Sequence, residues 1–250
     1  MKNNVSFNSE LSKFGIGLFE TIKVKNSKAI YLDMHLDRMY KSSNELNIAI
    51  KYGKKSLKKI IERYIEDNEL IDKAIRITVF DEGYNISHRD LIYNKELYEK
   101  GFKLITSPVK RGDSIIYRHK TTNYFENIYT KNYAKAKGFD EGLFTDLNGL
   151  ILEGSMSNIF FIKDKNIYTP GKNLPILSGT TRKRLKNLCL KYNIKFMECN
   201  INIEDIGKYD FCFISNSLMG IMKVIQINDI RFDKDNQLFE FIWRNLLWLI

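Results

Sequence analysis

Three short segments of the chain combine residue types that are suited to chemistry. Lys120 ends the run Arg-His-Lys at 118–120, and neighbouring positive charge lowers the pKa of an amine, as a lysine that forms a Schiff base requires. Glu153 precedes a glycine and a strongly apolar run, so its carboxylate needs a cationic partner once buried. The run Gly-Thr-Thr at 179–181 precedes a stretch with helical spacing, and the N–H groups at a helix start bind phosphate.

Each of these segments has an ordinary explanation when it is taken alone. A lysine near an arginine usually lies at the surface, and a threonine before a helix is commonly its cap. The patterns GxGxxG, GxxxxGK[ST], HExxH and GxSxG do not occur. The three histidines, His35, His88 and His119, lack the spacing of a zinc site, so we expect no metal.

The first hundred residues predict a small α/β domain that begins with a hairpin. Period-two alternation predicts the strands, and apolar residues at helical spacing predict the helices. The predicted elements are strands at 18–24, 29–32 and 74–80, a helix capped by Asp33, and a second helix over 57–65. Residues 84–101 are polar and weakly patterned, which favours a linker.

The rest of the chain is richer in strands. The predicted elements are strands at 102–106, 142–145, 158–163, 210–215 and 224–227, with helices at 123–137 and 181–192. We therefore predict an α+β fold of two domains: a small α/β domain at 1–97 and a larger, strand-rich domain at 98–250. The larger domain contains both Glu153 and the Gly-Thr-Thr run.

The composition limits the class of protein. The chain has 250 residues, 44% hydrophobic and 28% charged, which is typical of a globular protein. Its formal charge of +10 attracts anions, but no localised basic face carries base-stacking aromatic residues, so we expect no nucleic-acid partner. The first ten residues lack the apolar core of a secretory signal, and the apolar tail at 238–250 is too short to span a bilayer and is typical of a packing helix. We expect a cytoplasmic protein that has no membrane partner.

The chemically suited segments follow one another in an order that resembles a known family. In chain order the segments are Gly15-Ile-Gly-Leu-Phe-Glu-Thr, His35-Leu-Asp-Arg, Lys120-Thr-Thr-Asn-Tyr, Glu153-Gly-Ser-x-Ser-Asn-Ile-Phe, Thr169-Pro, Leu177-Ser-Gly-Thr-Thr-Arg and Phe213-Ile-Ser-Asn-Ser. The series resembles the fold-type IV pyridoxal-phosphate enzymes, also called class IV aminotransferases. That family includes branched-chain aminotransferases, D-amino-acid aminotransferases and 4-amino-4-deoxychorismate lyases. The resemblance implies a pseudo-barrel in the larger domain, pyridoxal 5′-phosphate as cofactor, and a homodimer.

The same resemblance implies a role for each matching residue. Lys120 would bind the cofactor as a Schiff base and move the substrate's α-proton. Glu153 would pair with the ring nitrogen and keep it protonated. Tyr124, expected one helical turn after the lysine, would reach the cofactor's phenolic oxygen or would simply pack on that turn. The cofactor phosphate would be bound by Arg38, Gly179, Thr180, Thr181 and Ser217.

The residue after Phe19 and Glu20 differs between members of the family. Branched-chain aminotransferases usually have glycine there and D-amino-acid aminotransferases an apolar residue, whereas the lyases have threonine, as this chain does at Thr21. The short spacing from Lys120 to Tyr124 also resembles the lyases. We therefore predict a 4-amino-4-deoxychorismate lyase that forms 4-aminobenzoate and pyruvate, a step toward folate, with Thr21 as a catalytic residue near the leaving group. The alternative explanation of Thr21 is a β-former that fills a strand position.

The sequence leaves several possibilities for the substrate-binding residues and for the activity. The lyase substrate has two carboxylates, which arginines bind well, and the candidates are Arg76, Arg89 and Arg118. The alternative activity within the family is a branched-chain or D-amino-acid aminotransferase. A non-catalytic anion-binding protein would explain the charge of +10 but not the ordered set of Lys120, Glu153 and 179–181.

Overall fold

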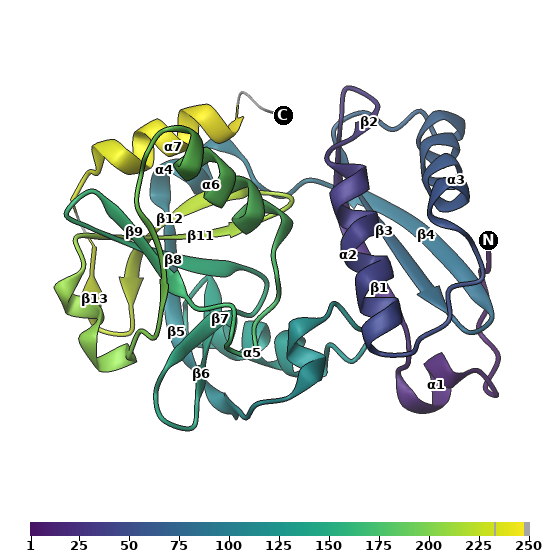
Figure 1. Cartoon of the computed structure of the whole chain (residues 1–250), viewed down its shortest axis with the longest axis horizontal. Coiled ribbons are helices and arrows are strands. Elements are labelled where there is room, and N and C mark those ends of the chain that lie inside the picture. The colour runs from purple at the N-terminus through teal and green to yellow at the C-terminus, as the bar shows by residue number, and fades with distance from the viewer. Residues whose placement is uncertain (233, 248–250) are drawn as a thin grey trace. The chain divides into compact units, whose positions relative to one another are not determined.

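Contacts divide the computed structural model of the chain into two compact units (Figure 1). The structure describes residues 1–232 and 234–247, so the last three residues of the predicted tail helix lie outside it. Unit 1 contains residues 1–92 and 119–124, and unit 2 contains 93–118 and 125–250. The sequence places the boundary at 97/98. The contacts place it earlier because Tyr93, Leu97 and Tyr98 pack against the hydrophobic core of unit 2.

Unit 1 is a four-stranded antiparallel sheet in the order β2-β1-β3-β4, with the helices α2 and α3 packed on it (Figure 1). Its elements are α1 (Glu10–Phe14), β1 (Leu18–Lys25), β2 (Lys28–Ala29), α2 (Leu32–Glu45), α3 (Lys54–Asp67), β3 (Lys73–Phe80) and β4 (Gly83–Asp90). The predicted hairpin, both helices and the strand at 74–80 are therefore confirmed. Tyr31 rather than Asp33 occupies the N-cap position of α2, which begins one residue before that aspartate.

The prediction of a linker at 84–101 is wrong. Residues 83–90 form strand β4, which pairs with β3 along its whole length after a tight turn, and residues 95–100 form the short helix α4. An edge strand is held by backbone hydrogen bonds to a single neighbour, so it tolerates polar side chains on its open side. The last four residues of β4 are all exposed, which explains why the segment has no apolar pattern.

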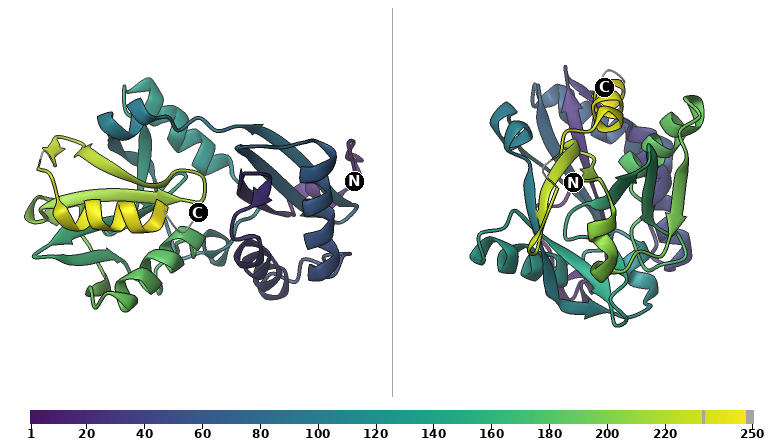
Figure 2. Two further views of the ribbon diagram at one scale, coloured as in Figure 1. Left: turned by 90° about the horizontal axis from the view of Figure 1, so that it is seen from above. Right: turned by 90° about the vertical axis from the view of Figure 1, so that its left-hand side faces the viewer.

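Unit 2 is built on a nine-stranded mixed sheet that curls on itself (Figure 2). The strand order is β10-β9-β8-β11-β12-β5-β6-β7, with β13 paired to β12, and β7 also contacts β8 and β9. Its strands are β5 (Phe102–Arg111), β6 (Glu141–Asp146), β7 (Ile151–Gly154), β8 (Asn158–Lys163), β9 (Asn166–Pro170), β10 (Phe196–Cys199), β11 (Phe211–Asn216), β12 (Gly220–Ile227) and β13 (Ile230–Arg231). The predicted α+β class, with a small sheet followed by a larger curled one, is confirmed.

Three helices pack on this sheet, at the places where the sequence predicts helices: α5 (Phe125–Ala136), α6 (Thr180–Lys191) and α7 (Gln237–Leu247). The short helices α4 (Lys95–Lys100), η1 (Ile115–Arg118) and η2 (Ile203–Lys208) are not predicted by the sequence. Helix α6 buries Leu185, Leu188 and Cys189, three residues of its predicted apolar face. Strands β7, β9 and β10 were not predicted. Each has only four or five residues, which is too short for a clear periodic signal.

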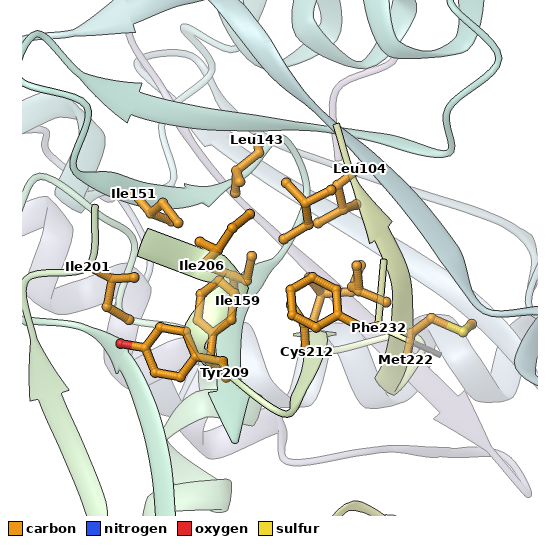
Figure 3. Close-up of a cluster of buried hydrophobic side chains, with 14 of the residues drawn as sticks. Leu104, Leu143, Ile151, Ile159, Ile201, Ile206, Tyr209, Cys212, Met222 and Phe232 are labelled. Atoms are coloured by element: carbon orange, nitrogen blue, oxygen red, sulfur yellow. The ribbon is translucent and has the colours of Figure 1, made fainter. Parts of the chain in front are cut away.

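The main core of unit 2 lies inside the curl of the sheet (Figure 3). Side chains from distant strands meet there, including Leu104 of β5, Leu143 of β6, Ile159 of β8 and Met222 of β12. Close packing of this kind holds the strand ends in a fixed geometry. Among residues 1–232 and 234–247, no helix is both long and apolar enough to cross a membrane.

Candidate active site

The segment that carries Lys120 is joined to strand β1 of unit 1. Leu18 and Thr121 form an isolated antiparallel bridge. The N–H of Phe19 donates a hydrogen bond to the carbonyl oxygen of Lys120 at 3.0 Å. These backbone contacts return residues 119–124 to unit 1 and place Lys120 beside Phe19, although the two are far apart in the sequence.

The ring of Phe19 gathers two cations and a second aromatic ring. The Nζ of Lys120 lies 4.3 Å from the ring centroid, and the Cζ of Arg76 lies 3.7 Å from it. The ring of Tyr124 meets Phe19 edge-on with centroids 5.1 Å apart, and its own centroid lies 5.1 Å from the same Nζ. Aromatic faces attract cations, so these rings orient the amine of Lys120.

Thr21 and Arg76 face each other across strands β1 and β3. Alternate residues of a strand point to one face, so Thr21 shares the face of Phe19 and lies near the same cations. Arg89 lies on the exposed part of β4, opposite Ala74, and donates to the carbonyl oxygen of Asp90 at 3.3 Å. The structure therefore brings Thr21 and Arg76 to the surroundings of Lys120, whereas Arg89 lies farther along the sheet.

On the other face of β1, Glu20 is fully buried against helix α2. Arg38 donates from Nε to Oε1 at 2.7 Å and from Nη2 to Oε2 at 2.6 Å, and His35 Nδ1 lies 2.7 Å from Oε2. Burial by itself would raise the pKa of Glu20, but Arg38 and then His35 outweigh it and lower that pKa to about 2. The guanidinium proposed to bind phosphate is thus oriented by a buried, ionised carboxylate.

The two residues before Lys120 lie in different units. His119, in unit 1, has Nδ1 2.9 Å from the hydroxyl of Ser42 and Nε2 3.5 Å from the carboxylate of Glu45. Arg118, in unit 2, pairs with Asp113 at 2.8 Å and donates to the carbonyl oxygen of Asn173 at 2.9 Å. Arg118 therefore has a carboxylate partner of its own, which the run Arg-His-Lys does not reveal.

In unit 2, Glu153 is buried on strand β7 and its carboxylate accepts several hydrogen bonds. Arg111 donates from Nη1 to Oε1 at 3.0 Å. The backbone N–H of Leu177 donates to Oε2 at 3.0 Å, and the Nδ2 of Asn158 approaches the same oxygen at 3.4 Å. The cation that pairs with this buried carboxylate is therefore Arg111, a residue that the sequence analysis did not single out.

Asn158 connects Glu153 to the start of helix α6. Its Nδ2 donates to the carbonyl oxygen of Leu177 at 3.0 Å, and a Cβ at position 179 would lie only 2.0 Å from its Oδ1, so glycine is needed there. Gly179 is the N-cap of α6 and makes no side-chain cap, while Thr180 and Thr181 are buried in the first turn. The first N–H groups of a helix have no partner within it and attract anions.

Strand β11 brings a further hydroxyl-bearing turn to this region. Ser215 pairs with Asn158 in the register between β11 and β8, and Ser217 follows in the turn toward β12. Within the described part of the chain, the Oγ of Ser215 is buried without a hydrogen-bond partner. An unsatisfied buried hydroxyl costs free energy, so this one points to a ligand group or a water at the site.

These donors fit the cofactor that the sequence resemblance implies. A buried, arginine-paired carboxylate suits a protonated ring nitrogen, and the first turn of α6, which has no side-chain cap and contains the buried Thr180 and Thr181, suits a phosphate. An amine held among aromatic rings suits an aldehyde carbon. The roles that the sequence resemblance implies for Lys120, Glu153, Arg38, the 179–181 turn and Ser217 stay predictions.

The position of Tyr124 differs from the prediction. Helix α5 begins at Phe125, so Tyr124 does not lie one helical turn after Lys120. Residues 119–124 belong with β1, and backbone pairing there leaves no helix before Phe125. Tyr124 is nevertheless near the amine, through ring contacts rather than through helical spacing.

Sequence reasoning also missed Arg111 and did not single out Asn158. Asn158 stands within the quoted motif that follows Glu153, so it was recognisable. Arg111 was not, because it ends a strand and its partner Glu153 lies 42 residues away. A single sequence contains no signal for such a pair.

Comparison with known proteins identifies relatives along nearly the whole chain. A family model described as "Amino-transferase class IV" matches residues 17–227. A Rickettsia felis protein assigned as a branched-chain-amino-acid aminotransferase is 29% identical over 84% of this chain and 77% of its own length. An aminodeoxychorismate lyase of Bacillus subtilis is 23% identical over 88% and 80%. A D-alanine aminotransferase of Staphylococcus aureus is 26% identical over 90% and 84%.

Solved structures share the fold. A Legionella pneumophila protein assigned as a 4-amino-4-deoxychorismate lyase superposes with a TM-score of 0.91, covering 100% of this chain and 97% of its own at 24% identity. A branched-chain aminotransferase from the archaeon Thermoproteus uzoniensis, solved with norvaline, gives a TM-score of 0.89 over 99% and 91% at 21% identity. Another branched-chain amino acid aminotransferase, solved with pyridoxamine 5′-phosphate, gives 0.89 over 98% and 88% at 21% identity. Lyases and aminotransferases thus have one architecture, and the fold does not separate them.

Proposed function

The chain belongs to the class IV aminotransferase family of pyridoxal-phosphate enzymes, and we propose that it is a lyase that converts 4-amino-4-deoxychorismate into 4-aminobenzoate and pyruvate. The observation that carries the proposal is Thr21. It follows Phe19 and Glu20 and lies opposite Arg76, on the sheet face where Phe19 contacts the amine of Lys120. A hydroxyl at this position serves an elimination and has no counterpart in the residue types usual in the aminotransferases.

Three residues of the chain have separate roles in the proposed reaction. When bound, the cofactor supplies an electron-withdrawing ring that stabilises negative charge at the substrate carbon. Lys120, as a free amine, would take the proton from the ring carbon that carries the substrate amine. Glu153 holds a proton at the cofactor's ring nitrogen by offering it a fixed negative charge. Thr21 would donate a hydrogen bond to the enol-ether oxygen while its bond to the ring carbon breaks and the six-membered ring becomes aromatic. The leaving enolate would take up one proton, equal to the one that Lys120 removes, and become pyruvate.

Arg76 is the substrate-binding arginine that the geometry favours. It faces Thr21 directly and its guanidinium lies over the ring of Phe19, which the amine of Lys120 also contacts. A guanidinium binds a carboxylate through two parallel hydrogen bonds, and the lyase substrate carries two carboxylates. Arg118 and Arg89 remain weaker candidates, because Arg118 already pairs with Asp113 and Arg89 lies farther along β4.

A branched-chain or D-amino-acid aminotransferase is the second candidate, favoured by relatives of both kinds at 29% and 26% identity. The experiment that separates the candidates supplies purified, cofactor-loaded protein with 4-amino-4-deoxychorismate and measures 4-aminobenzoate and pyruvate. Parallel reactions offer branched-chain amino acids and D-alanine with 2-oxo acids. Release of 4-aminobenzoate and pyruvate in equal amounts supports the lyase. Efficient amino transfer without 4-aminobenzoate contradicts it.

The variant Thr21→Val tests the residue on which the proposal rests. It keeps the shape of the side chain and removes the hydroxyl, so we expect 4-aminobenzoate release to fall on the order of 10²-fold, the range for losing one proton donor. Thr106→Val is the matched control, because Thr106 also lies on a strand, β5, and its hydroxyl accepts from Asn228 rather than contacting a residue proposed for the site. Equal losses in the two variants would show that a strand hydroxyl, and not Thr21 in particular, matters.

We also propose that the enzyme is a cytoplasmic homodimer. This rests on the family resemblance. Light scattering of the purified protein tests the oligomeric state. A monomer at micromolar concentration with full activity would contradict it.

A further inference from the structure

Among the described residues, Arg111 has the largest side chain that is fully buried, and this side chain carries a charge. Only 2% of its surface is exposed. It lies at the end of β5 in unit 2, and its guanidinium carbon lies 3.5 Å from the ring centroid of Phe144 and 4.4 Å from that of Tyr117. A buried charge is costly unless its partners compensate for the lost water. The site of Arg111 is therefore built for a specific contact.

That contact is Glu153. The Nη1 of Arg111 donates to Oε1 at 3.0 Å, so a charge-assisted hydrogen bond fixes one oxygen of the carboxylate. The other oxygen, Oε2, accepts from the backbone N–H of Leu177 at 3.0 Å. Both oxygens of Glu153 are thus oriented by donors that come from different elements of unit 2.

Arg111 is itself held in place by a second residue that reaches the same loop. Its Nη2 donates to the Oδ1 of Asn127 at 3.1 Å, and the Nδ2 of Asn127 donates to the carbonyl oxygen of Ser155 at 2.7 Å. Ser155 lies two residues after Glu153. One arginine and one asparagine therefore link the carboxylate and the turn that follows it.

We propose that Arg111 is a positioning residue that keeps Glu153 ionised and aims its carboxylate at the ring nitrogen of pyridoxal phosphate. The inference rests on the role proposed for Glu153. Without the guanidinium, the buried carboxylate would lose its charged donor, and an uncompensated buried carboxylate takes up a proton. A protonated Glu153 offers no negative charge to the ring nitrogen. Arg111 acts through Glu153.

The other carboxylate near the guanidinium does not replace Glu153. The Oε2 of Glu126 lies 3.5 Å from the Nε of Arg111, and neither of these two buried atoms has a hydrogen-bond partner among the described residues. Glu126 is 41% exposed at its side chain, so its charge is partly screened by water. The hydrogen-bonded, buried partner of Arg111 is Glu153.

The test measures cofactor affinity rather than turnover. The full chain is freed of cofactor and titrated with pyridoxal 5′-phosphate, following protein fluorescence, for the wild type and Arg111→Met. We expect the dissociation constant of the variant to rise about 10- to 100-fold, the range for losing one hydrogen bond to a charged group. Lys110→Met is the matched control: it removes the same charge from the neighbouring, exposed residue of β5, and its affinity should equal that of the wild type.

A double-mutant cycle separates positioning from simple support of the fold. In a Glu153→Gln background, Arg111→Met should cost little further affinity, because the residue that it positions has lost its charge. The 1-deaza analogue of the cofactor has carbon in place of the ring nitrogen, and its affinity should not change in Arg111→Met. Additive losses in the cycle, or equal losses for cofactor and analogue, would overturn the proposal.

Two further variants keep the test decisive if Arg111→Met does not fold. Arg111→Lys keeps the charge but cannot reach Glu153 and Asn127 together, and Asn127→Ala releases the guanidinium without removing it. Both should raise the dissociation constant about threefold to tenfold, a loss smaller than that of the whole charge. Wild-type affinity in both would overturn the proposal. If Glu153→Gln alone leaves the affinity unchanged, the role proposed for Glu153 fails, and that failure is recognisable separately.

Discussion

Replacing Glu20 by glutamine should lower the free energy of unfolding by about 3–5 kcal/mol at neutral pH, the cost of removing one partner of a buried ion pair. Glu20 is fully buried, and it accepts both donors of the Arg38 fork while His35 lies 2.7 Å from the same carboxylate. Glutamine keeps the shape but leaves the guanidinium without its negative charge. The guanidinium of Arg38, whose side chain is only 12% exposed, then lacks a charged partner in the folded state.

The pKa of Glu20 gives an independent magnitude and its sign. Folding lowers that pKa from 4.5 to about 2, because Arg38 and His35 outweigh the opposing effect of burial. A lowered pKa stabilises the fold fully above about 4.5, and the stabilisation is lost as the pH falls from there toward 2. At about 1.4 kcal/mol per pH unit, the depression corresponds to about 3 kcal/mol, which agrees with the ion-pair cost.

The assay is urea unfolding of the full chain at pH 7 and in steps down to pH 3, for the wild type and Glu20→Gln. Glu62→Gln, an exposed glutamate of helix α3, is the control and should change stability by less than about 0.5 kcal/mol. The difference between wild type and Glu20→Gln should shrink by about 2 kcal/mol at pH 3, because the wild-type carboxylate is losing its advantage. A variant within about 1 kcal/mol of wild type at pH 7, or a difference that does not change with pH, would refute the reasoning.

Lys120, Arg38 and Glu141 each give one further prediction. Lys120→Ala should abolish the visible absorbance of bound cofactor while the unfolding curve is kept, and borohydride reduction of the wild type should label Lys120 on peptide mapping; a label on another lysine contradicts the assignment. Arg38→Lys should raise the dissociation constant for pyridoxal phosphate about tenfold with turnover largely restored by excess cofactor, since an ammonium cannot hold Glu20 through two donors and also present a further N–H to the phosphate; unchanged affinity would remove Arg38 from the phosphate site. Burial raises the pKa of Glu141 from 4.5 to about 7, so the folded chain keeps a proton that the unfolded chain loses, and stability falls as the pH rises through that window. Glu141→Gln never ionises and should gain about 3 kcal/mol relative to wild type between pH 5 and pH 8 in urea unfolding, whereas a constant difference would exclude the ionisation.

The sequence by itself determined the elements whose cause is local. Helix α3 buries Leu57, Ile61 and Ile65 because apolar residues recur at helical spacing, and neighbours along the chain are enough to predict that. The ordered motifs around Lys120, Glu153 and 179–181 likewise indicated the family, because residue type and chain order suffice for a resemblance. Strand β4 was not predicted, because backbone pairing with β3 holds it in the sheet and its own side chains have no apolar pattern.

Tertiary structure alone decided which partners the charged residues have. Arg111 reaches Glu153 across 42 residues, and the helix α2 residue Arg38 reaches Glu20 of strand β1. Lys120 lies beside Phe19 because the strand bridge at Leu18 brings its segment back to unit 1. A buried charge is stable only next to a compensating group, and in a single sequence that group can be any residue of opposite charge. The packing of the strands selects one of them, and with it the geometry of the site.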